Sequence, residues 1–268
     1  MTERNGPFDE KDGALKIFRA GQQGYVVEWG GRKLGLDLFL TPSERRLVGN
    51  FFEPEDLGDF TLLFGSHDHD DHIDREAWVK IAGACPKVKF VAPAYFEETL
   101  PGELHIPSSR FLFVDETRPA EYGGIGIRAV AAAHEFLDTD PDTGLHPYLC
   151  YDLELGPYRI FHAGDTCRYD GLAEKILRLG APDIAFLPIN GRDAKRYASG
   201  CIGNMTYQEA ADLAGDIAPG LTIPGHFDMF ANNLENPELF GDYMRVKYPA
   251  LRVRILPAGT SLVYRKEE

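Results

Sequence analysis

The chain has 268 residues, of which 44% are hydrophobic and 26% are charged. This balance is that of a folded globular protein and excludes a disordered or fibrous chain. The formal net charge of −14 argues against a general nucleic-acid binder, because a phosphate backbone requires a basic surface, although a small anionic substrate responds only to the local field of its pocket.

The sequence predicts neither a disulfide framework nor a membrane anchor. The N-terminal segment lacks the apolar stretch of a signal peptide, and no apolar run approaches the roughly 18 residues that a membrane-spanning helix needs. The cysteines are scattered and form no CxxC pair, which favours a reducing compartment; they are Cys85, Cys150, Cys167 and Cys201. We therefore expect a cytoplasmic protein.

The first part of the chain is predicted to form strands and then a helix. After a polar lead-in over residues 1–12, three apolar runs predict strands, and Gly30-Gly31 predicts a hairpin turn between the second and the third. The apolar run at 60–65 predicts a buried strand. Asp74 has the position of an N-cap for a helix over 75–84.

The rest of the chain alternates strands and helices. The expected strands lie at 88–93, 110–114, 124–133, 147–155, 158–164, 183–189, 221–226, 252–257 and 261–265, and the expected helices at 170–180, 206–217 and 237–247. Gly156-Pro157 predicts a second hairpin turn, and Thr206 with Glu209 forms a capping-box pattern. No repeat or linker divides the chain, so we expect one domain over residues 13–268, an α/β (α+β) fold of two mixed β-sheets with helices on the outer faces.

Residue types that bind metals gather at the ends of these strands. Because residues two apart in an extended segment project to the same side, His67 and His69 are expected to point together. Asp71 and His72 follow where the chain turns toward its helix, and they can face a second position nearby. Three more candidates come at or directly after later strands: His134, Asp165 and His226.

This mixture of imidazoles and carboxylates suits a pair of divalent ions. Imidazole binds zinc, iron and related metals, and a shared carboxylate supplies negative charge. We expect one ion at His67, His69 and His134, and a second at Asp71, His72 and His226. Asp165 would bridge the two. Zinc, manganese and iron all accept such ligands, so the sequence does not choose among them.

Each candidate also has a simpler interpretation. Residues 67–72 could form a solvated acidic loop, His134 and His226 could be hydrogen-bonded core histidines, and Asp165 could be a turn residue.

The remaining histidines are expected to have structural roles. We expect His105 and His146 on the surface, and His162 in the core or behind a metal ligand. We expect Cys167 to be a packed residue.

The segment 67–72 resembles the HxHxDH motif of the metallo-β-lactamase superfamily. This resemblance implies an αββα sandwich with the metals at one edge of the two sheets. The segments SHDHDDHID, FHAGDT, DIAFLPING and LTIPGHFDMFANN are similar to the branch that contains L-ascorbate-6-phosphate lactonase and related metal-dependent hydrolases. The chain departs from the lactonase in lacking its longer N-terminal and central segments, and in having His134 near the position of a lactonase carboxylate.

The expected activity is metal-dependent hydrolysis. A metal-activated water would attack an ester, lactone or phosphoester, with Asp71 as the catalytic residue that orients the water or accepts its proton. The role of Asp71 as a base and its role as a ligand compete, and both remain open.

A substrate loop is expected over residues 190–197. It follows a predicted strand on the metal side and gathers basic residues in an acidic chain. Asn190, Arg192 and Lys195 are its candidates, and Arg192 could hold an anion with two hydrogen bonds. Asn204 precedes a helix N-terminus, which also attracts anions. The alternative is a solvated charged loop.

We therefore expect a hydrolase for a small anionic ester or lactone, with a sugar-phosphate lactone among the candidates. The alternatives are a phosphodiesterase- or nuclease-type hydrolase and a metal-binding protein without turnover. Neither nucleic acid nor a membrane is an expected partner. A homo-oligomer is compatible with the sequence, because soluble enzymes commonly form one.

Overall fold

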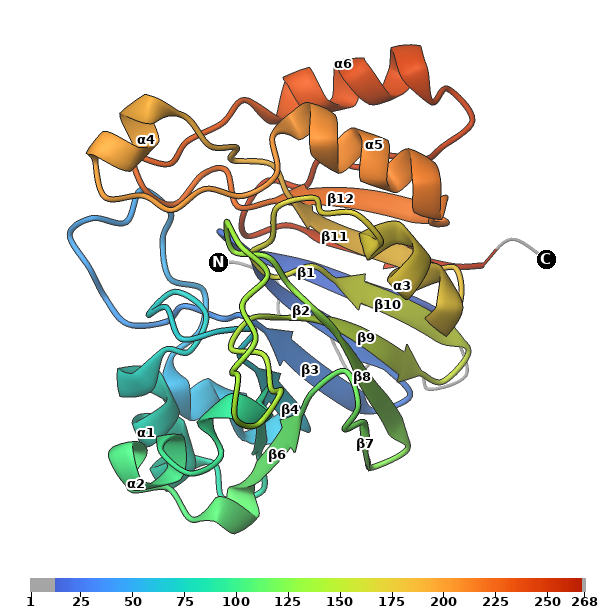
Figure 1. Ribbon diagram of the computed structural model, residues 1–268. Helices are drawn as coiled ribbons and strands as arrows, with labels where there is room; N and C mark the ends of the chain where they lie inside the picture. Colours follow the sequence, from blue (N-terminus) through green and yellow to red (C-terminus); the bar gives the residue numbers. More distant parts are fainter. Residues whose placement is uncertain (1–12, 267–268) are drawn as a thin grey trace.

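The computed structural model describes residues 13–266, and the predicted lead-in over residues 1–12 lies outside this range. Its core is a pair of mixed β-sheets packed face to face (Figure 1). Within the described range, no helix is both long and apolar enough to cross a bilayer.

The first sheet has seven strands in the order β13-β1-β2-β3-β4-β5-β6. Their bounds are β1 Leu15–Gly21, β2 Gly24–Trp29, β3 Arg32–Leu36, β4 Leu62–Phe64, β5 Lys89–Pro93, β6 Phe111–Val114 and β13 Ser261–Tyr264. Strands β3 to β6 are parallel, whereas β13, β1, β2 and β3 pair antiparallel.

The second sheet has six strands in the order β12-β11-β10-β9-β8-β7. Their bounds are β7 Ala120–Tyr122, β8 Ile125–Ala131, β9 Leu149–Leu155, β10 Tyr158–His162, β11 Ile184–Pro188 and β12 Leu221–Gly225. Here β10, β11 and β12 are parallel, and β7 to β10 pair antiparallel.

Helices cover the outer face of each sheet. On the first sheet lie α1 Arg75–Ala84 and α2 Leu100–Leu104; on the second lie α3 Leu172–Leu179, α5 Tyr207–Ile217 and α6 Pro237–Lys247, with α4 Ala194–Ala198 near the metal-site edge (Figure 1). Short 3₁₀ segments occur at Pro54–Asp59, Ala94–Phe96 and Ser108–Arg110. The arrangement is the predicted αββα sandwich, so the expected fold class is confirmed.

The space between the sheets is filled by apolar side chains from both. Tyr25 of β2 stacks on Phe186 of β11 with ring centres 3.9 Å apart, and Phe64 of β4 meets the edge of Tyr151 of β9 at 5.2 Å. Full burial of one such side chain contributes about 1.5–3 kcal/mol. These contacts hold the two sheets in a fixed relation, which a site built from both sheets requires.

Local sequence signals identified the turns and caps correctly. Gly30 and Gly31 have φ angles of 56° and 72° in the β2–β3 turn, the left-handed values that glycine tolerates. The Asp74 side chain accepts a hydrogen bond from the Ala77 amide at the start of α1. Thr206 and Glu209 form the capping box of α5. All three predictions are confirmed.

One predicted strand is absent. Residues 252–257 make only a single bridge, between Val253 and Thr222, before the chain leaves the side of β12 and carries Leu256 into the core between the sheets. The apolar alternation of this segment reflects the packing of Val253 and Ile255 against the buried cluster on the outer side of the second sheet, rather than a ladder. Conversely, β7, α2 and α4 were not predicted, because segments of three to five residues carry too little pattern.

Strand direction places the expected metal ligands at one edge. In the first sheet β1, β3 and β4 run the same way, and in the second so do β8, β10 and β12. The loops that follow these strands therefore meet at a common edge of the sandwich, which is where rigid scaffolds present functional side chains.

Candidate metal centre

The loop after β4 supplies four of the predicted ligands. It turns back on itself, because the amides of His72 and Ile73 both donate to the His69 carbonyl, at 2.9 and 2.8 Å. Gly65 is needed at its start, since a Cβ there would lie 2.4 Å from Ile73. At its end, Asp74 accepts hydrogen bonds from the Leu40 and Thr41 amides. The loop is thus fixed before any ligand is bound.

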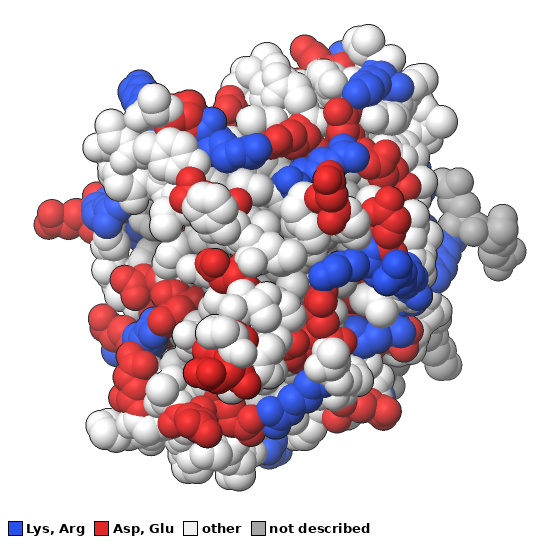
Figure 2. Space-filling model, viewed as in Figure 1, with Lys and Arg blue, Asp and Glu red and all other residues white. Residues whose placement is uncertain are grey.

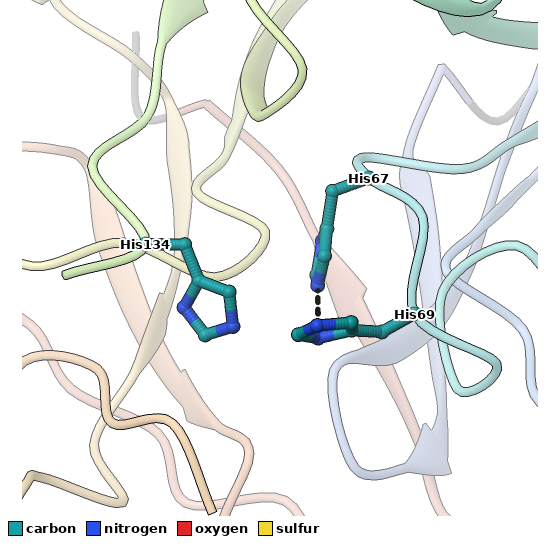
Figure 3. Close-up of side chains that lie close together, drawn as sticks. All are labelled: His67, His69 and His134. Carbon is teal, nitrogen blue, oxygen red and sulfur yellow. Dashed lines mark hydrogen bonds between the residues drawn. The ribbon is translucent and has the colours of Figure 1, made fainter. Parts of the chain in front are cut away.

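The structure brings all seven predicted ligands together. Their ligand atoms form three overlapping groups in which every pair of atoms lies within 4.8 Å: His67, His69 and His134; His67, His72 and Asp165; and Asp71, His72 and His226. Figure 3 shows the first group, with His134 approaching from a separate segment opposite His67 and His69. The first and third groups have the membership that the sequence predicted for two ions.

Asp165 lies between these groups. Its carboxylate oxygens are 3.4 Å from Nε2 of His72, 3.2 Å from Nε2 of His226 and 3.8 Å from Nε2 of His134. It is the only one of the seven whose carboxylate is this close to imidazoles of both predicted sites within the described chain. This position matches the bridging role expected of it.

A buried carboxylate that the sequence did not single out supports the ligands from behind. Oδ2 of Asp37 lies 2.7 Å from Nδ1 of His72 and 2.9 Å from Nε2 of His162, and it accepts a 2.7 Å hydrogen bond from the Ser66 hydroxyl. A histidine that donates from Nδ1 presents the lone pair of Nε2 on its other side. Asp37 therefore directs Nε2 of His72 toward the ligand groups.

The electrostatics prepare two histidines as neutral ligands. Burial lowers the pKa of His67 well below its usual value and that of His134 to about 4. Both imidazoles are therefore neutral near pH 7, the form in which histidine binds metals.

His72 and Asp165 hold opposite charges. Burial opposes the charge on His72, but Asp165, Asp37 and Asp71 together outweigh it and raise its pKa well above the usual value. Burial alone would raise the pKa of Asp165, yet His226 and His72 lower it well below the usual range. The proton on His72 therefore neutralises part of the negative charge of Asp165, Asp37 and Asp71. A bound cation could supply the same positive charge.

Unpaired polar atoms show that the residues fit a metal. Nε2 of His72 and Oδ1 of Asp165 are buried and form an ion pair at 3.4 Å, yet neither has a hydrogen-bond partner among residues 13–266, which leaves both able to bind a ligand. Both atoms point into the cluster of imidazoles and carboxylates, a donor set that suits divalent first-row ions.

A cavity of about 610 Å³ opens beside the centre. Besides His69, Asp71, His134, Asp165 and His226, its walls include Gln22, Thr41, Arg45, Cys201, Ile202 and Phe230.

Two arginines line this cavity. Arg75 is paired with Asp68 and Glu103, whereas Arg45 has no ion-pair partner within the described residues and lies 5.5 Å from the ring centre of Phe230. Arg45 is thus the available cation of this cavity, and sequence analysis missed it.

None of the four predicted substrate residues lines this cavity. Arg192 forms two hydrogen bonds with Glu209, at 2.6 and 2.7 Å, and Lys195 is exposed on α4. Asn204 donates to Asn190, which donates to Asn233. Asn233 in turn lies 3.4 Å from Nδ1 of His226, so the two asparagines reach the centre indirectly. Their part in substrate binding stays a prediction.

The remaining histidines have the structural settings expected of them, with one difference. His105 is exposed, and His162 is buried against Asp37. His146, expected on the surface, is half-buried because its Nδ1 and its backbone amide both bond to Asp115. Cys167 is buried and lies 3.6 Å from the Gly203 carbonyl oxygen.

Known proteins are similar to this chain in sequence and in fold. Residues 35–227 match the model of the beta-lactamase superfamily domain. A UPF0173 metal-dependent hydrolase from Caldivirga maquilingensis is 33% identical over 90% of this chain and 95% of its own, and another from Pyrococcus horikoshii is 26% identical over 92% and 99%.

A solved structure, the metallo hydrolase Igni18 from Ignicoccus hospitalis, superposes with a TM-score of 0.72 at 21% identity, covering 95% of this chain and all of that one (100%). At this identity the likeness supports the fold alone. The comparisons do not single out the ascorbate-6-phosphate lactonase branch. The match over residues 35–227 and the 33% identity along most of its length show that the chain belongs to the metallo-β-lactamase superfamily and, within it, to the UPF0173 metal-dependent hydrolases.

Proposed function

We propose that the protein hydrolyses a small anionic ester or lactone with water activated by two divalent ions, in the cytoplasm. The observation that carries the proposal is the convergence of seven ligand side chains beside a cavity that contains an available arginine. A sugar-phosphate lactone is a substrate of this class.

Divalent ions bound here would polarise the scissile carbonyl and lower the pKa of the attacking water. The two outer ligand groups and the position of Asp165 between them support two ions rather than one. Zinc, manganese and iron are all compatible with these side chains.

Asp71 is the candidate catalytic residue. Its side chain is 18% exposed, whereas those of His72, Asp165 and His226 are 0%, 4% and 3% exposed, so it is the more exposed of the two carboxylates of the centre that line the cavity. Oδ2 accepts a 2.8 Å hydrogen bond from Gln22, which leaves Oδ1 to orient the attacking water or to accept its proton.

Substrate recognition would use the cavity wall. The guanidinium of Arg45 can hold a phosphate or carboxylate of the substrate with two hydrogen bonds, and Phe230 and Ile202 supply apolar contacts. Asn190 and Asn204 would act through Asn233 by orienting His226. The pairing of Arg192 with Glu209 would anchor the segment that carries Cys201 and Ile202.

Two alternatives predict different outcomes. A phosphodiesterase or nuclease would have to attract a polyanion, but Figure 2 shows Asp and Glu side chains gathered over the lower left of this face, around α1 and α2. A metal-binding protein without turnover would not need a complete ligand set, including Asp71, beside an open cavity. Both observations favour a hydrolase for small molecules.

The test is elemental analysis of the purified protein, followed by a screen of lactones, carboxylic esters and phosphoesters with zinc, manganese or iron restored. We expect about two ions per chain and turnover of an anionic lactone or ester. Absence of bound metal, or metal-loaded protein inactive on every class, would refute the proposal. Preferential cleavage of phosphodiesters would instead support the alternative of a phosphodiesterase or nuclease.

A further inference from the structure

Gln22 lies within the metal centre although it belongs to no metal-binding motif. It sits in the turn between β1 and β2, where the register of the hairpin shifts, and it is only 1% exposed. Its side-chain Nε2 is 2.8 Å from Oδ2 of Asp71 and 3.0 Å from Nε2 of His226. The amide thus contacts two of the three residues expected to hold the second ion.

The backbone of Gln22 is held firmly in an unfavourable conformation. Its φ angle is 52°, and that of His226 is 58°; residues other than glycine keep such angles only when their surroundings impose them. The Gln22 carbonyl accepts hydrogen bonds from the His226 amide at 2.8 Å and from Arg19 at 3.1 Å, and its amide donates to Asp228 at 2.9 Å. The side chain is therefore aimed at the centre by several independent contacts.

A buried ion pair provides much of this support. Arg19 is fully buried, and its guanidinium forms two hydrogen bonds with the Asp228 carboxylate, at 2.5 and 3.0 Å. Asp228 follows His226 by two residues, so the same pair fixes the turn that carries Gln22 and the segment that carries the ligand. Strain maintained in this way is typical of functional sites.

The orientation of the amide conflicts with ion binding. An NH₂ group is a donor, yet it faces Nε2 of His226 and Oδ2 of Asp71, and those atoms would be engaged by a cation. The amide oxygen Oε1 is buried and has no partner among the described residues. Because the two ends of an amide have almost the same shape, a half-turn of the group would place the oxygen where the nitrogen lies.

We propose that Gln22 is a ligand of the second ion, through Oε1, together with Asp71, His72 and His226. This inference rests on the proposed function. Without the ion, the NH₂ group holds Asp71 and His226 in place; with the ion, the amide turns and its oxygen binds. An added neutral oxygen suits ions that prefer oxygen ligands, such as manganese.

The test compares three variants by metal content and metal affinity. Gln22→Leu removes the oxygen at similar volume, and Gln22→Glu replaces it with a charged oxygen. Gln23→Leu is the matched control, because Gln23 is equally buried and its amide has no partner within the described chain. Ion-to-protein ratios after dialysis and dissociation constants for Mn²⁺ and Zn²⁺, from competition with a chromophoric chelator, give a readout independent of activity.

We expect Gln22→Leu to weaken binding of the second ion about 10- to 100-fold, lowering the ratio of ions to protein from about two to about one. Gln22→Glu should bind that ion at least about 10-fold more tightly, and Gln23→Leu should behave as the wild type. If Gln22→Leu keeps wild-type affinity, the inference is overturned while the proposed function stands.

If circular dichroism shows that Gln22→Leu does not fold, the affinity of Gln22→Glu for the second ion tests the inference instead. An affinity equal to or weaker than that of the wild type would overturn the inference. Wild-type protein that binds no ion at all would overturn the proposed function and this inference together.

Discussion

The Asp37 carboxylate lies 2.7 Å from Nδ1 of His72, and both side chains are fully buried. Asp37 also contacts His162 and Ser66, so one carboxylate joins β3, the ligand loop and β10. This contact connects the folding of the sandwich to the orientation of a metal ligand, because the charge that aligns His72 is itself buried by the two sheets. The nearby histidines lower the pKa of Asp37 although its burial acts in the opposite sense.

Replacement of Asp37 by asparagine should weaken both the site and the fold. His72 would lose the partner that fixes its orientation, and we expect metal affinity to fall about 10- to 100-fold. Breaking a buried charged pair should also reduce the free energy of unfolding by about 3 kcal/mol. Chelator competition and urea unfolding measure the two effects. Asp152→Asn is the control, since Asp152 is equally buried but bonds to Arg128 and Arg159; it should lose stability and keep its metal.

Metal loading should release at least one proton per chain near pH 7, from His72. In the metal-free protein the pKa of His72 is raised, so its imidazole carries a proton that a metal ligand must give up. His67 and His134 are already neutral because their pKa values are lowered, and Asp165 is already ionised. Calorimetry in buffers of different ionisation enthalpy counts the protons. Affinity should therefore rise with pH; loading without proton release would contradict this account.

The same proton affects stability without metal. A raised pKa in the folded state means that the contribution of His72 is fully present below its unfolded value of 6.5 and is lost as the pH rises through the folded value. Asp165 acts in the opposite direction, since its contribution is lost as the pH falls through its lowered folded pKa. Thermal unfolding of metal-free protein across pH should show a decline on both sides, and added metal should remove the alkaline decline.

Replacement of Asp71 by asparagine should separate chemistry from metal binding. Asparagine keeps an oxygen that can face the ion but cannot accept a proton, so kcat should fall about 100-fold or more while metal content is partly retained. Asp70→Asn, at the exposed neighbouring position, should stay close to the wild type. A fully active Asp71→Asn enzyme would remove Asp71 from the reaction.

Replacement of Arg45 by glutamine should affect anionic substrates selectively. Loss of a charge-assisted hydrogen bond of about 1.5 kcal/mol corresponds to an increase in KM of about 10-fold, and a neutral ester should be unaffected. Arg245→Gln is the matched control, because it removes one positive charge from an exposed pair with Asp242 on α6. Equal KM values for the anionic substrate in wild type and Arg45→Gln would exclude Arg45 from recognition.

Much of the fold and the clustering of the seven candidate ligands could be predicted from the sequence because their signals are local. The helix start at Asp74 depends on a hydrogen bond three residues away, and the hairpin at Gly30 depends on the backbone freedom of glycine. The spacing of His67, His69, Asp71 and His72 is equally short-range. Such patterns are fixed by covalent geometry and are visible in a stretch of six residues.

Asp37, Gln22 and Arg45 could not be predicted in the same way. Each is a single polar residue in an otherwise ordinary segment. Asp37 and Gln22 acquire their roles from partners far along the chain, and Arg45 acquires its role from the cavity that it lines. Asp37 meets His72 and His162, and Gln22 meets Asp71 and His226. Arg192 shows the reverse case, because a partner 17 residues away, Glu209, neutralises the charge that had suggested an anion site.

The sequence alone indicates most of the strands, caps and turns, and it identifies the side chains with metal-binding chemistry, because these signals depend on neighbouring residues. The folded arrangement alone reveals which carboxylate contacts His72, which amide contacts Asp71 and His226, and which arginine remains available in the cavity. The physical reason is that hydrogen bonds and ion pairs act over a few ångströms in space, and packing of the two sheets brings residues as far apart as Gln22 and His226 to within that distance.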